Sequence, residues 1–581
     1  MLIKARNVLN TRTLALAAPS SRLLTTTEPI VLNFQDTKAA YASKSTLELL
    51  RSRIVLRLCS SDLIVDNNEA LMKFGRTVLR GGLFEKVMKM TFYGQFVGGT
   101  DVADLRKKLD KMQEYGVKPI LDYSVEADLK EDSQDEVPEG GQPMENSKYN
   151  RDDISSSRDK HKAVARAYPY SGEESCEANL AIFLQCLEAA SEVCTTGDAF
   201  SAIKITGLSK PNALLEGSQF LLRIQQIFEE YSDQHEDTLP GFMDMLSLPK
   251  DVLGPKVPMI KRRMTIERFN SMMDDFKADI SQEERNEIYV AMISSEPGRV
   301  KFHKFLDYCK PNKPLYNVLQ GLKTPEGNIV LNPLHDIHLQ ALDNCEARLL
   351  TLADRAVELD AKLLIDAEQT YFQPIIDYFA NMLMSRYNKE KVHIFNTYQC
   401  YLKDTPCQLI SDAGKADALQ YKLGAKLVRG AYMEQERQRA LDMTYADPIY
   451  PNKALTNSCY HNMIEILLKQ VELEKCQFMV ASHNEFSIQY VVERMRQSAI
   501  DPQSGGVFFG QLLGMCDQVT YLLGAGGYCS YKYVPYGPVD AVLPYLSRRA
   551  YENKGMLQGS QKEIDLLKGE LKRRKWGISR G

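Results

Sequence analysis

The chain has 581 residues, of which 44% are hydrophobic and 25% are charged. This is the composition of an ordinary soluble protein, long enough for one barrel-sized domain and additional segments. The net charge of −4 argues against nucleic acid as a general partner. No apolar run approaches the ~20 residues of a membrane-spanning helix, so any membrane contact is predicted to be peripheral.

The first 27 residues form a basic segment without acidic side chains. Four Lys or Arg residues stand there among Leu, Ala, Ser and Thr, and the first acidic residue is Glu28. This basic amphipathic pattern is typical of a mitochondrial transit peptide, which we predict over residues 1–27.

Residues 28–115 show helical periodicity, and these helices are expected to cap or flank the main domain. The periodic apolar residues include Leu47, Leu50, Ile54, Leu71, Phe74, Val78, Leu105 and Leu109. A strand is predicted at 117–125. The acidic stretch 126–160 that follows has almost no apolar periodicity and is predicted to be a mobile insertion.

Strand and helix patterns then alternate, which predicts parallel β/α units within a main domain over residues 116–560. The predicted strands are 117–125, 202–206, 362–366, 393–399, 425–429, 478–483, 507–511 and 530–534. Eight strands are the number that closes a (β/α)₈ barrel. The fold class predicted is therefore α/β, a distorted TIM barrel with a helical N-terminal region.

The alternation breaks over 232–332, where a helical insertion is expected. Within it, residues 293–306 resemble the end of an EF-hand, with Gly298 at the sixth loop position. Ile293 and Lys304 occupy the first and last ligand positions, where calcium requires carboxylates. We therefore interpret the segment as a degenerate hand that serves for packing.

The last segment, 561–581, carries the basic run Lys572–Lys575 beside Trp576, the single tryptophan. Such a run can touch an anionic membrane, but a solvated basic tail is the favoured interpretation.

Twelve cysteines are scattered without a CxxC pair. In a chain of this length they indicate structural thiols in a reducing compartment. His335 and His338 are one helical turn apart, but a structural or surface role is favoured over a metal site. No metal is predicted.

Polar side chains occur at or near the carboxyl end of nearly every predicted strand. They are Asp122, Lys204, Asp366, Gln399, Lys426, Arg429, His483, Asn484, Gln511 and Tyr533. In a barrel these ends form the catalytic face. Lys204 and Lys426 are the most informative, because a charge inside a buried strand is costly unless an anion or a hydrogen-bond network meets it.

A helix expected to open at Pro538 places Tyr545, Arg548, Arg549 and Glu552 on one face. Two guanidinium groups offer forked donors that match a carboxylate, and Glu552 can hold them in place. No dinucleotide fingerprint or nucleophilic serine turn is present. A barrel mouth beneath two arginines suits a large anionic cofactor and a small carboxylate substrate.

Five segments together closely resemble the mitochondrial proline dehydrogenase (proline oxidase) family. They are 366–374 (DAEQTYFQP), 427–432 (LVRGAY), 481–485 (ASHNE), 511–515 (QLLGM) and 545–553 (YLSRRAYEN). The resemblance implies FAD inside a distorted (β/α)₈ barrel and oxidation of L-proline to Δ1-pyrroline-5-carboxylate. It also implies electron delivery to ubiquinone at the matrix face of the inner mitochondrial membrane.

The resemblance also implies roles for individual residues. Asp366 and Lys426 match catalytic positions, while the matches to substrate-binding positions are Lys204, Leu512, Tyr533, Arg548, Arg549 and Glu552. Matches to cofactor-binding positions are Gln399, Arg429, Gly430, Ala431, Tyr432, Ser482 and His483. Bacterial members carry Arg where Lys426 stands, so the charge is kept but the fork is lost.

Two alternatives remain open from the sequence. One is hydroxyproline dehydrogenase, in which the residue matching Tyr533 is smaller and leaves room for a ring hydroxyl. The other is a non-catalytic mitochondrial interaction protein, whose barrel is a relic and whose degenerate hand is a docking surface.

Overall fold

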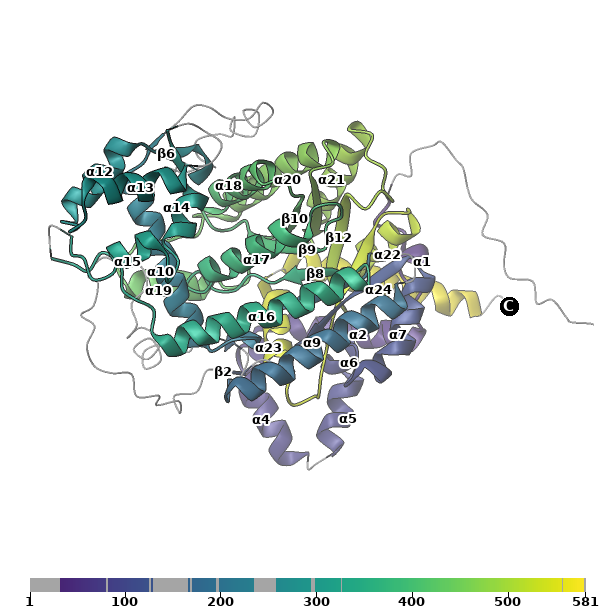
Figure 1. Cartoon of the computed structure of the whole chain (residues 1–581). Coiled ribbons are helices and arrows are strands. Elements are labelled where there is room, and N and C mark those ends of the chain that lie inside the picture. The colour runs from purple at the N-terminus through teal and green to yellow at the C-terminus, as the bar shows by residue number, and fades with distance from the viewer. Residues whose placement is uncertain are drawn as a thin grey trace, which may run out of the picture.

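We describe the protein from a computed structural model of the whole chain (Figure 1). The structure describes residues 32–79, 82–124, 127–128, 166–167, 170–194, 198–234, 258–293, 298–324, 327–555 and 557–578. Within these ranges, the side chains of 69, 73, 127–128, 166–167, 551–560 and 576–578 are not described. The predicted transit peptide and most of the acidic insertion lie outside the described residues.

Eight strands close into a barrel in the order β1-β13-β12-β11-β10-β9-β8-β4, and every pair is parallel. The strands are β1 Val117–Tyr123, β4 Phe200–Ile203, β8 Lys362–Ile365, β9 Ile394–Gln399, β10 Leu423–Val428, β11 Cys476–Ala481, β12 Val507–Leu512 and β13 Ser530–Tyr536. All eight correspond to the predicted strands, so the (β/α)₈ fold class is confirmed.

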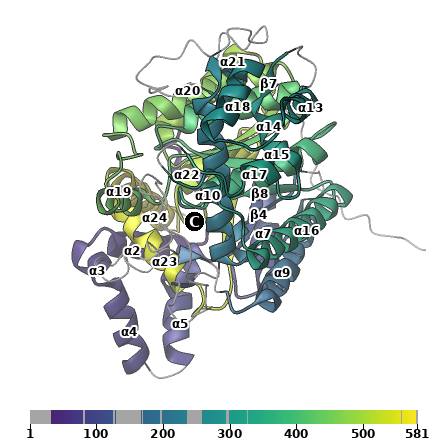
Figure 2. The same cartoon turned by 60° about the vertical axis from the view of Figure 1, so that its left-hand side comes forward.

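Helices surround this barrel on its outer face (Figure 2). They are α9 Glu173–Val193, α10 Pro211–Glu230, α16 Asp336–Glu358, α17 Gln373–Tyr387, α18 Thr405–Ala418, α19 Met433–Asp442, α20 Lys453–Glu472, α21 Glu485–Gln497 and α22 Asp517–Ala525. Outward-facing strand residues such as Leu363, Leu427 and Phe509 are buried beneath these helices in the main hydrophobic core.

The lower part of the barrel lumen is filled with apolar side chains. Phe200 packs edge-on against Phe508 and Tyr531, with ring centroids 5.0 Å apart in both pairs. Successive inward positions along a strand are two residues apart. Two positions beyond Leu364 and Tyr531, toward the carboxyl ends, stand Asp366 and Tyr533. The lumen is therefore closed by hydrocarbon below and lined by polar groups above.

Short helices precede the barrel and pack beside it. They are α1 Thr37–Ala40, α2 Thr46–Cys59, α3 Asp62–Asp66, α4 Asn68–Val78, α5 Gly82–Met90, α6 Phe92–Phe96 and α7 Val102–Glu114. Ser45 and Glu48 form a capping box at the start of α2.

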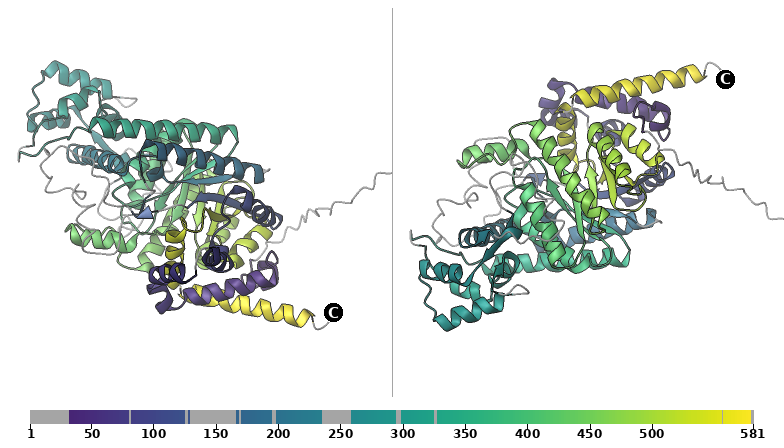
Figure 3. Two further views of the ribbon diagram at one scale, coloured as in Figure 1. Left: turned by 90° about the horizontal axis from the view of Figure 1, so that it is seen from below. Right: turned by 90° about the horizontal axis from the view of Figure 1, so that it is seen from above.

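The expected solvated tail at 561–581 is correct for Lys572, Arg573 and Lys575, which are exposed, but wrong for the helix that carries them, because one side of it is packed. Helix α24 Leu557–Ile578 contacts α2 and α1, as the yellow and purple ribbons of Figure 3 show. Leu567 is fully buried there, and Arg574 donates to the carbonyl oxygen of Tyr41 at 2.9 Å. Of the basic run 572–575, only Arg574 is described as reaching the N-terminal segment, whereas Arg573 pairs with Glu570 on α24 itself.

The insertion between α10 and α16 has its own core. It contains η3 Met259–Lys261, α12 Ile266–Asp275, α13 Gln282–Met292, α14 Phe302–Tyr308, α15 Pro314–Leu319 and a small sheet of β5 Asp233–Gln234, β6 Arg262–Met264 and β7 Val300–Lys301. Phe269, Met272 and Phe305 are fully buried within it. The helix-loop-helix of α13 and α14 is EF-hand-like in order, and its buried face serves packing.

Two local expectations differ from the structure. Lys204 follows β4 rather than lying inside it, at the start of the short η1 helix Ile205–Gly207. The helix expected to open at Pro538 begins as α23 at Leu543 and ends at Gly555, because residues 538–542 form turns first. A two-residue ladder of β2 Ala127–Asp128 and β3 Arg166–Ala167 was not predicted.

All twelve cysteines are free and eleven are buried, as predicted for structural thiols. Among the described helices, none is both long and apolar enough to cross a membrane.

Candidate active site

Three charged or polar side chains meet at the carboxyl ends of β8, β10 and β13. The ammonium group of Lys426 forms an ion pair with Asp366 Oδ1, and the Tyr533 hydroxyl donates to Asp366 Oδ2 at 2.8 Å. Lys426 Nζ also lies 5.7 Å from the centre of the Tyr533 ring. Lys426 and Asp366 are buried. Each position follows from strand periodicity, and the cluster holds a fixed cation over an aromatic face.

A second cluster lies at the ends of β1 and β4. Lys204 Nζ is 4.0 Å from Asp122 Oδ1, and the Ser124 hydroxyl donates to Asp122 Oδ2. Asp122 is 1% exposed, so its charge depends on these partners. Lys204 therefore stands at the mouth, on the opposite side of β8 from Lys426.

Glu368 and Gln369 are buried residues that were not among the predicted site residues. Glu368 accepts from the Thr206 hydroxyl at 2.8 Å and the Thr206 backbone N–H at 3.2 Å. Burial raises the pKa of Glu368 to about 7 despite these bonds. Gln369 is 1% exposed, and both polar atoms of its side chain lack a hydrogen-bond partner among the described residues. The sequence signal that could have identified Glu368 and Gln369 as site residues is their position just after the end of β8.

Arg429 lies beyond the end of β10 in a cage of neutral acceptors. Its guanidinium donates to Asn457 Oδ1 at 2.9 Å, and to the hydroxyls of Ser482 and Ser487 at 2.8 Å each. Its centre lies 4.3 Å from the centre of the Tyr460 ring. In the described part of the chain, no carboxylate lies within 4.0 Å of it. The fork is thus rigidly placed, and its charge is available for an anion.

The residues after Arg429 form an exposed turn. Gly430 has φ +134°, and a Cβ there would lie 2.3 Å from the ring of Tyr401. Only glycine fits this position. Ala431 is exposed and Tyr432 is half-buried before α19. Gln399, at the end of β9, donates to the carbonyl oxygen of Glu368 at 2.8 Å.

His483 links the ends of β11 and β12. The backbone N–H of Leu512 donates to His483 Nε2 at 3.0 Å, so this nitrogen is an acceptor. Burial, together with the positive charges of Lys532 and Arg549, lowers the pKa of His483 to about 3. The imidazole is therefore neutral.

Helix α23 carries the two predicted arginines. Arg549 is 6% exposed and its guanidinium carbon lies 4.7 Å from the centre of the Tyr545 ring. Arg548 is half-buried. The backbone of Glu552 lies on the same helix, but its side chain is outside the described residues. Leu546 and Ala550 are buried and attach this helix to the core.

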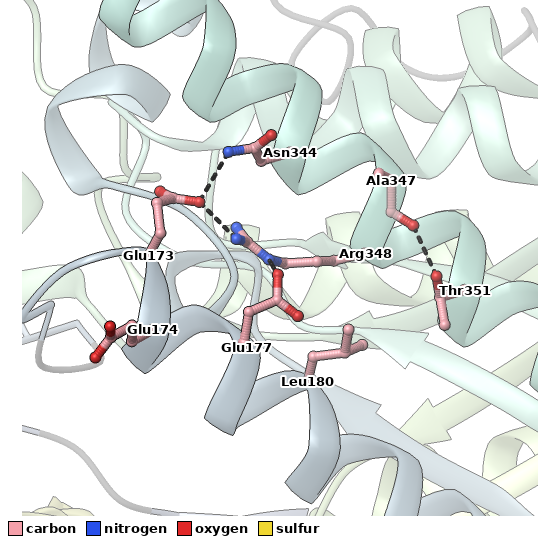
Figure 4. Close-up of a pocket in the computed structure, with 8 residues that line it drawn as sticks. All are labelled: Glu173, Glu174, Glu177, Leu180, Asn344, Ala347, Arg348 and Thr351. Carbon is pink, nitrogen blue, oxygen red and sulfur yellow. Dashed lines mark hydrogen bonds and ion pairs between the residues drawn. The ribbon is translucent and has the colours of Figure 1, made fainter.

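A groove on the outer surface lies between α9 and α16 and is not the predicted site (Figure 4). Three of its four charged residues pair with one another: Arg348 pairs with Glu173 Oε2 at 2.5 Å and with Glu177 Oε1 at 2.8 Å. Asn344 also donates to Glu173, at 3.0 Å. Since these groups already have partners, the groove offers little to a ligand.

Glu216, His335 and His338 join α10 to α16. His335 Nδ1 lies 2.6 Å from Glu216 Oε1, and His338 Nδ1 bonds to Oε2. The three residues each offer one atom that could bind a metal, and these atoms lie within 4.8 Å of one another. Each carboxylate oxygen meets one imidazole, which is the pattern of a structural link between two helices. The absence of a metal site stays a prediction.

The family model for proline dehydrogenase matches residues 257–562, more than half of the chain. The human protein named proline dehydrogenase 1, mitochondrial, is 37% identical over 96% of this chain and 92% of its own. The chain belongs to the proline dehydrogenase family. It is therefore an oxidoreductase, and the resemblance noted in the sequence is confirmed.

Hydroxyproline dehydrogenase of Xenopus laevis is more distant, at 32% identity over 94% of this chain and 90% of its own. Among solved structures, proline utilization A from Bdellovibrio bacteriovorus aligns with a TM-score of 0.47 and 13% identity. That alignment covers 89% of this chain and 38% of the bacterial chain.

The stability of the folded protein is expected to depend on pH through His483, and this can be tested. The unfolded state takes up a proton below pH 6.5, whereas the native imidazole stays neutral down to about pH 3. Stability from this group is therefore present above pH 6.5 and is lost as the pH falls. Because a minority of the residue's surface reaches solvent, we expect a loss of at most about 2 kcal/mol between pH 6.5 and 5.

His483→Gln keeps an acceptor for the Leu512 N–H but does not titrate. Urea unfolding midpoints at pH 6.5 and 5 should differ less in this variant than in the parent chain. Other buried histidines contribute equally to both proteins. An identical pH dependence would show that His483 is protonated in the native state.

Proposed function

We propose that this chain oxidises L-proline to Δ1-pyrroline-5-carboxylate and passes the electrons to ubiquinone. The ring carbon next to nitrogen loses a hydride and the nitrogen loses a proton, so that a C=N bond forms. The quinone takes up two electrons and two protons and becomes the quinol. Membership of the family supports the reaction, and the charged cluster at the barrel mouth supports its location.

The observation that carries the proposal is the ion pair of Lys426 and Asp366, joined to Tyr533 at the open end of the lumen. A buried pair of this kind is rarely a stabilising device by itself. Here it fixes a cation where negative charge develops during hydride transfer, which is the arrangement that electrostatic catalysis requires.

FAD is the cofactor we propose, and the residues at the mouth fit it. Arg429 is a rigid fork without a carboxylate partner among the described residues, which suits an anionic group. Gln369 offers a buried amide with both a donor and an acceptor to use. The residues proposed to hold FAD are Gln399, Arg429, Gly430, Ala431, Tyr432, Ser482 and His483. Bound FAD would supply the hydride acceptor.

The substrate carboxylate is assigned to the arginines of α23. Arg549 is buried beside Tyr545 and its charge reaches His483 at the mouth, which supports a clamp over the lumen. Arg548 shares the helix, and Lys204 adds a third cation from the end of β4. Glu552 is proposed to orient the arginines, and Leu512 to pack against the ring. Orientation of the ring supplies much of the catalysis.

Anaerobic addition of L-proline to the purified protein tests cofactor and substrate together. We expect a yellow chromophore that bleaches on addition and recovers when a quinone is supplied. A protein without flavin absorbance, even after reconstitution with FAD, would instead support a non-catalytic interaction protein.

Proline is favoured over hydroxyproline because Tyr533 fills space above the ring and is fixed by Asp366. Tyr533→Ser should raise the ratio of kcat/KM for hydroxyproline to that for proline by at least about tenfold, since it opens room for a hydroxyl. Tyr533→Phe is the matched control, because it removes the bond to Asp366 but keeps the bulk. If the parent chain prefers hydroxyproline, the proposed activity is wrong and the chain acts as a hydroxyproline dehydrogenase.

Mitochondrial location at the matrix face of the inner membrane is part of the proposal. It is supported by the basic leader of residues 1–27 and by relatives that are named mitochondrial. Ubiquinone is a membrane lipid, so peripheral contact with the bilayer is required for the second half of the reaction.

A further inference from the structure

The helices α4 and α5 form a hairpin that extends from the body of the molecule in both Figure 1 and Figure 2. Its inner side is packed: the ring of Phe84 on α5 lies against α4, where a Cβ added to Gly75 would be 3.3 Å from it. Met88 is buried on the same side as Phe84. The two helices are thus held as one amphipathic unit.

The outer side of this hairpin exposes large apolar side chains. On α4 these are Leu71, Phe74 and Val78, spaced as one helix face, and Phe74 is 65% exposed. On α5 they are Leu83, Val87 and Met90, again on one face, with Leu83 53% exposed. Single exposed apolar residues need no explanation, but six on two adjacent helices mark a docking surface.

The charge of the hairpin identifies what it docks to. Residues 68–90 contain five Lys or Arg and two Glu, a net charge of +3 in a chain of net charge −4. Lys86 and Lys89 are exposed. Apolar faces flanked by basic residues suit an anionic lipid surface. A second copy of the same hairpin would bring like charges together.

The base of the hairpin is attached to the helix of the candidate active site. The Ser547 hydroxyl on α23 donates to Asn68 Oδ1 at 2.6 Å, and both residues are buried. Arg76 forms an ion pair with Asp540, and the Tyr93 hydroxyl donates to the carbonyl oxygen of Gly537 at 2.8 Å. Any surface that holds the hairpin would therefore also fix the position of α23 and of the loop after β13.

We infer that the α4–α5 hairpin inserts its apolar faces into the interfacial region of an anionic phospholipid bilayer. The hairpin thereby holds the arginine helix and the barrel mouth next to the membrane. This deepens the proposed function, and rests on it only for the claim that a lipid-soluble quinone is the electron acceptor.

Co-sedimentation of the full chain with vesicles tests the inference. Binding is expected with phosphatidylcholine plus phosphatidylglycerol, and weaker binding with phosphatidylcholine alone. Phe74→Glu/Leu83→Glu should lower the partition coefficient at least about tenfold. Val290→Glu/Leu473→Glu is the matched control, because it places two charges on equally exposed apolar residues of α13 and of the end of α20. This control should change binding less than about twofold.

Lys86→Glu/Lys89→Glu separates the electrostatic contribution, since it should weaken binding to anionic vesicles and leave binding to neutral vesicles unchanged. Parent and hairpin variants should oxidise proline equally with a water-soluble acceptor, while the variants slow with quinone in vesicles. Equal vesicle binding by the parent and Phe74→Glu/Leu83→Glu would overturn the inference. A lipid-free dimer that this double variant abolishes, without vesicle binding, would also overturn it. Vesicle binding without proline oxidation would contradict the proposed function alone.

Discussion

Replacing Lys426 by methionine is expected to lower kcat for proline about 10²- to 10³-fold, the effect of removing one fixed positive group at a reacting centre. The variant should also be less stable by about 3–5 kcal/mol, because Asp366 is left buried without its partner. Stopped-flow reduction by proline and denaturant unfolding measure the two effects separately.

A second variant separates catalysis from folding. In Lys426→Met/Asp366→Asn no unpaired charge remains, and asparagine still accepts from Tyr533. Stability should largely recover while kcat stays low. Lys391→Met is the matched control, because Lys391 forms an exposed pair with Asp360 at 2.9 Å. It should cost less than about 1 kcal/mol and leave kcat unchanged. If kcat also recovers in the double variant, the ion pair of Lys426 and Asp366 has only a structural role.

Arg549→Lys is expected to raise KM for proline about 10- to 150-fold with a smaller change in kcat. Lysine keeps the charge but cannot offer two parallel donors to a carboxylate. Loss of one charge-assisted hydrogen bond is worth about 1.5–3 kcal/mol, which corresponds to that range. The position is buried, so solvent does not replace the lost bond.

Two comparisons show whether the carboxylate is the group that Arg549 holds. Prolinamide, which lacks the carboxylate charge, should bind weakly to the parent. Its affinity for Arg549→Lys should be about the same. Arg355→Lys is the control, since two nitrogens of Arg355 donate to Glu188 Oε1, at 3.1 and 2.9 Å, far along α16. It should leave KM unchanged. An unaltered KM in Arg549→Lys would remove the residue from the proposed clamp.

The strand ends show why so much of the barrel could be predicted. Buried parallel strands are short apolar runs, and a charged residue among them, such as Lys426, has to be met by a partner. The sequence alone indicated that Asp366, Lys426 and Tyr533 belong to strand ends. It could not pair them, because residues 366 and 533 lie more than 160 positions apart and meet only when the barrel closes.

Patterns of helical residues were less informative about burial. Leu71, Phe74 and Val78 predicted a helix correctly, but periodicity does not say which partner covers the face. The basic run at 572–575 indicated a solvated tail, and three of its four residues are exposed, but the helix that carries them is packed against α2. In both cases the deciding contacts are with elements distant in the chain.

The sequence by itself determined the eight strands, the polar residues at their ends and the family, since alternation, strand-end chemistry and linear motifs are local properties. Only the tertiary structure decided that Arg429 is caged by neutral acceptors, that Gln369 is buried without a described partner and that α4 and α5 face solvent. These are properties of neighbours in space, which burial and hydrogen bonding fix only once the whole chain is folded.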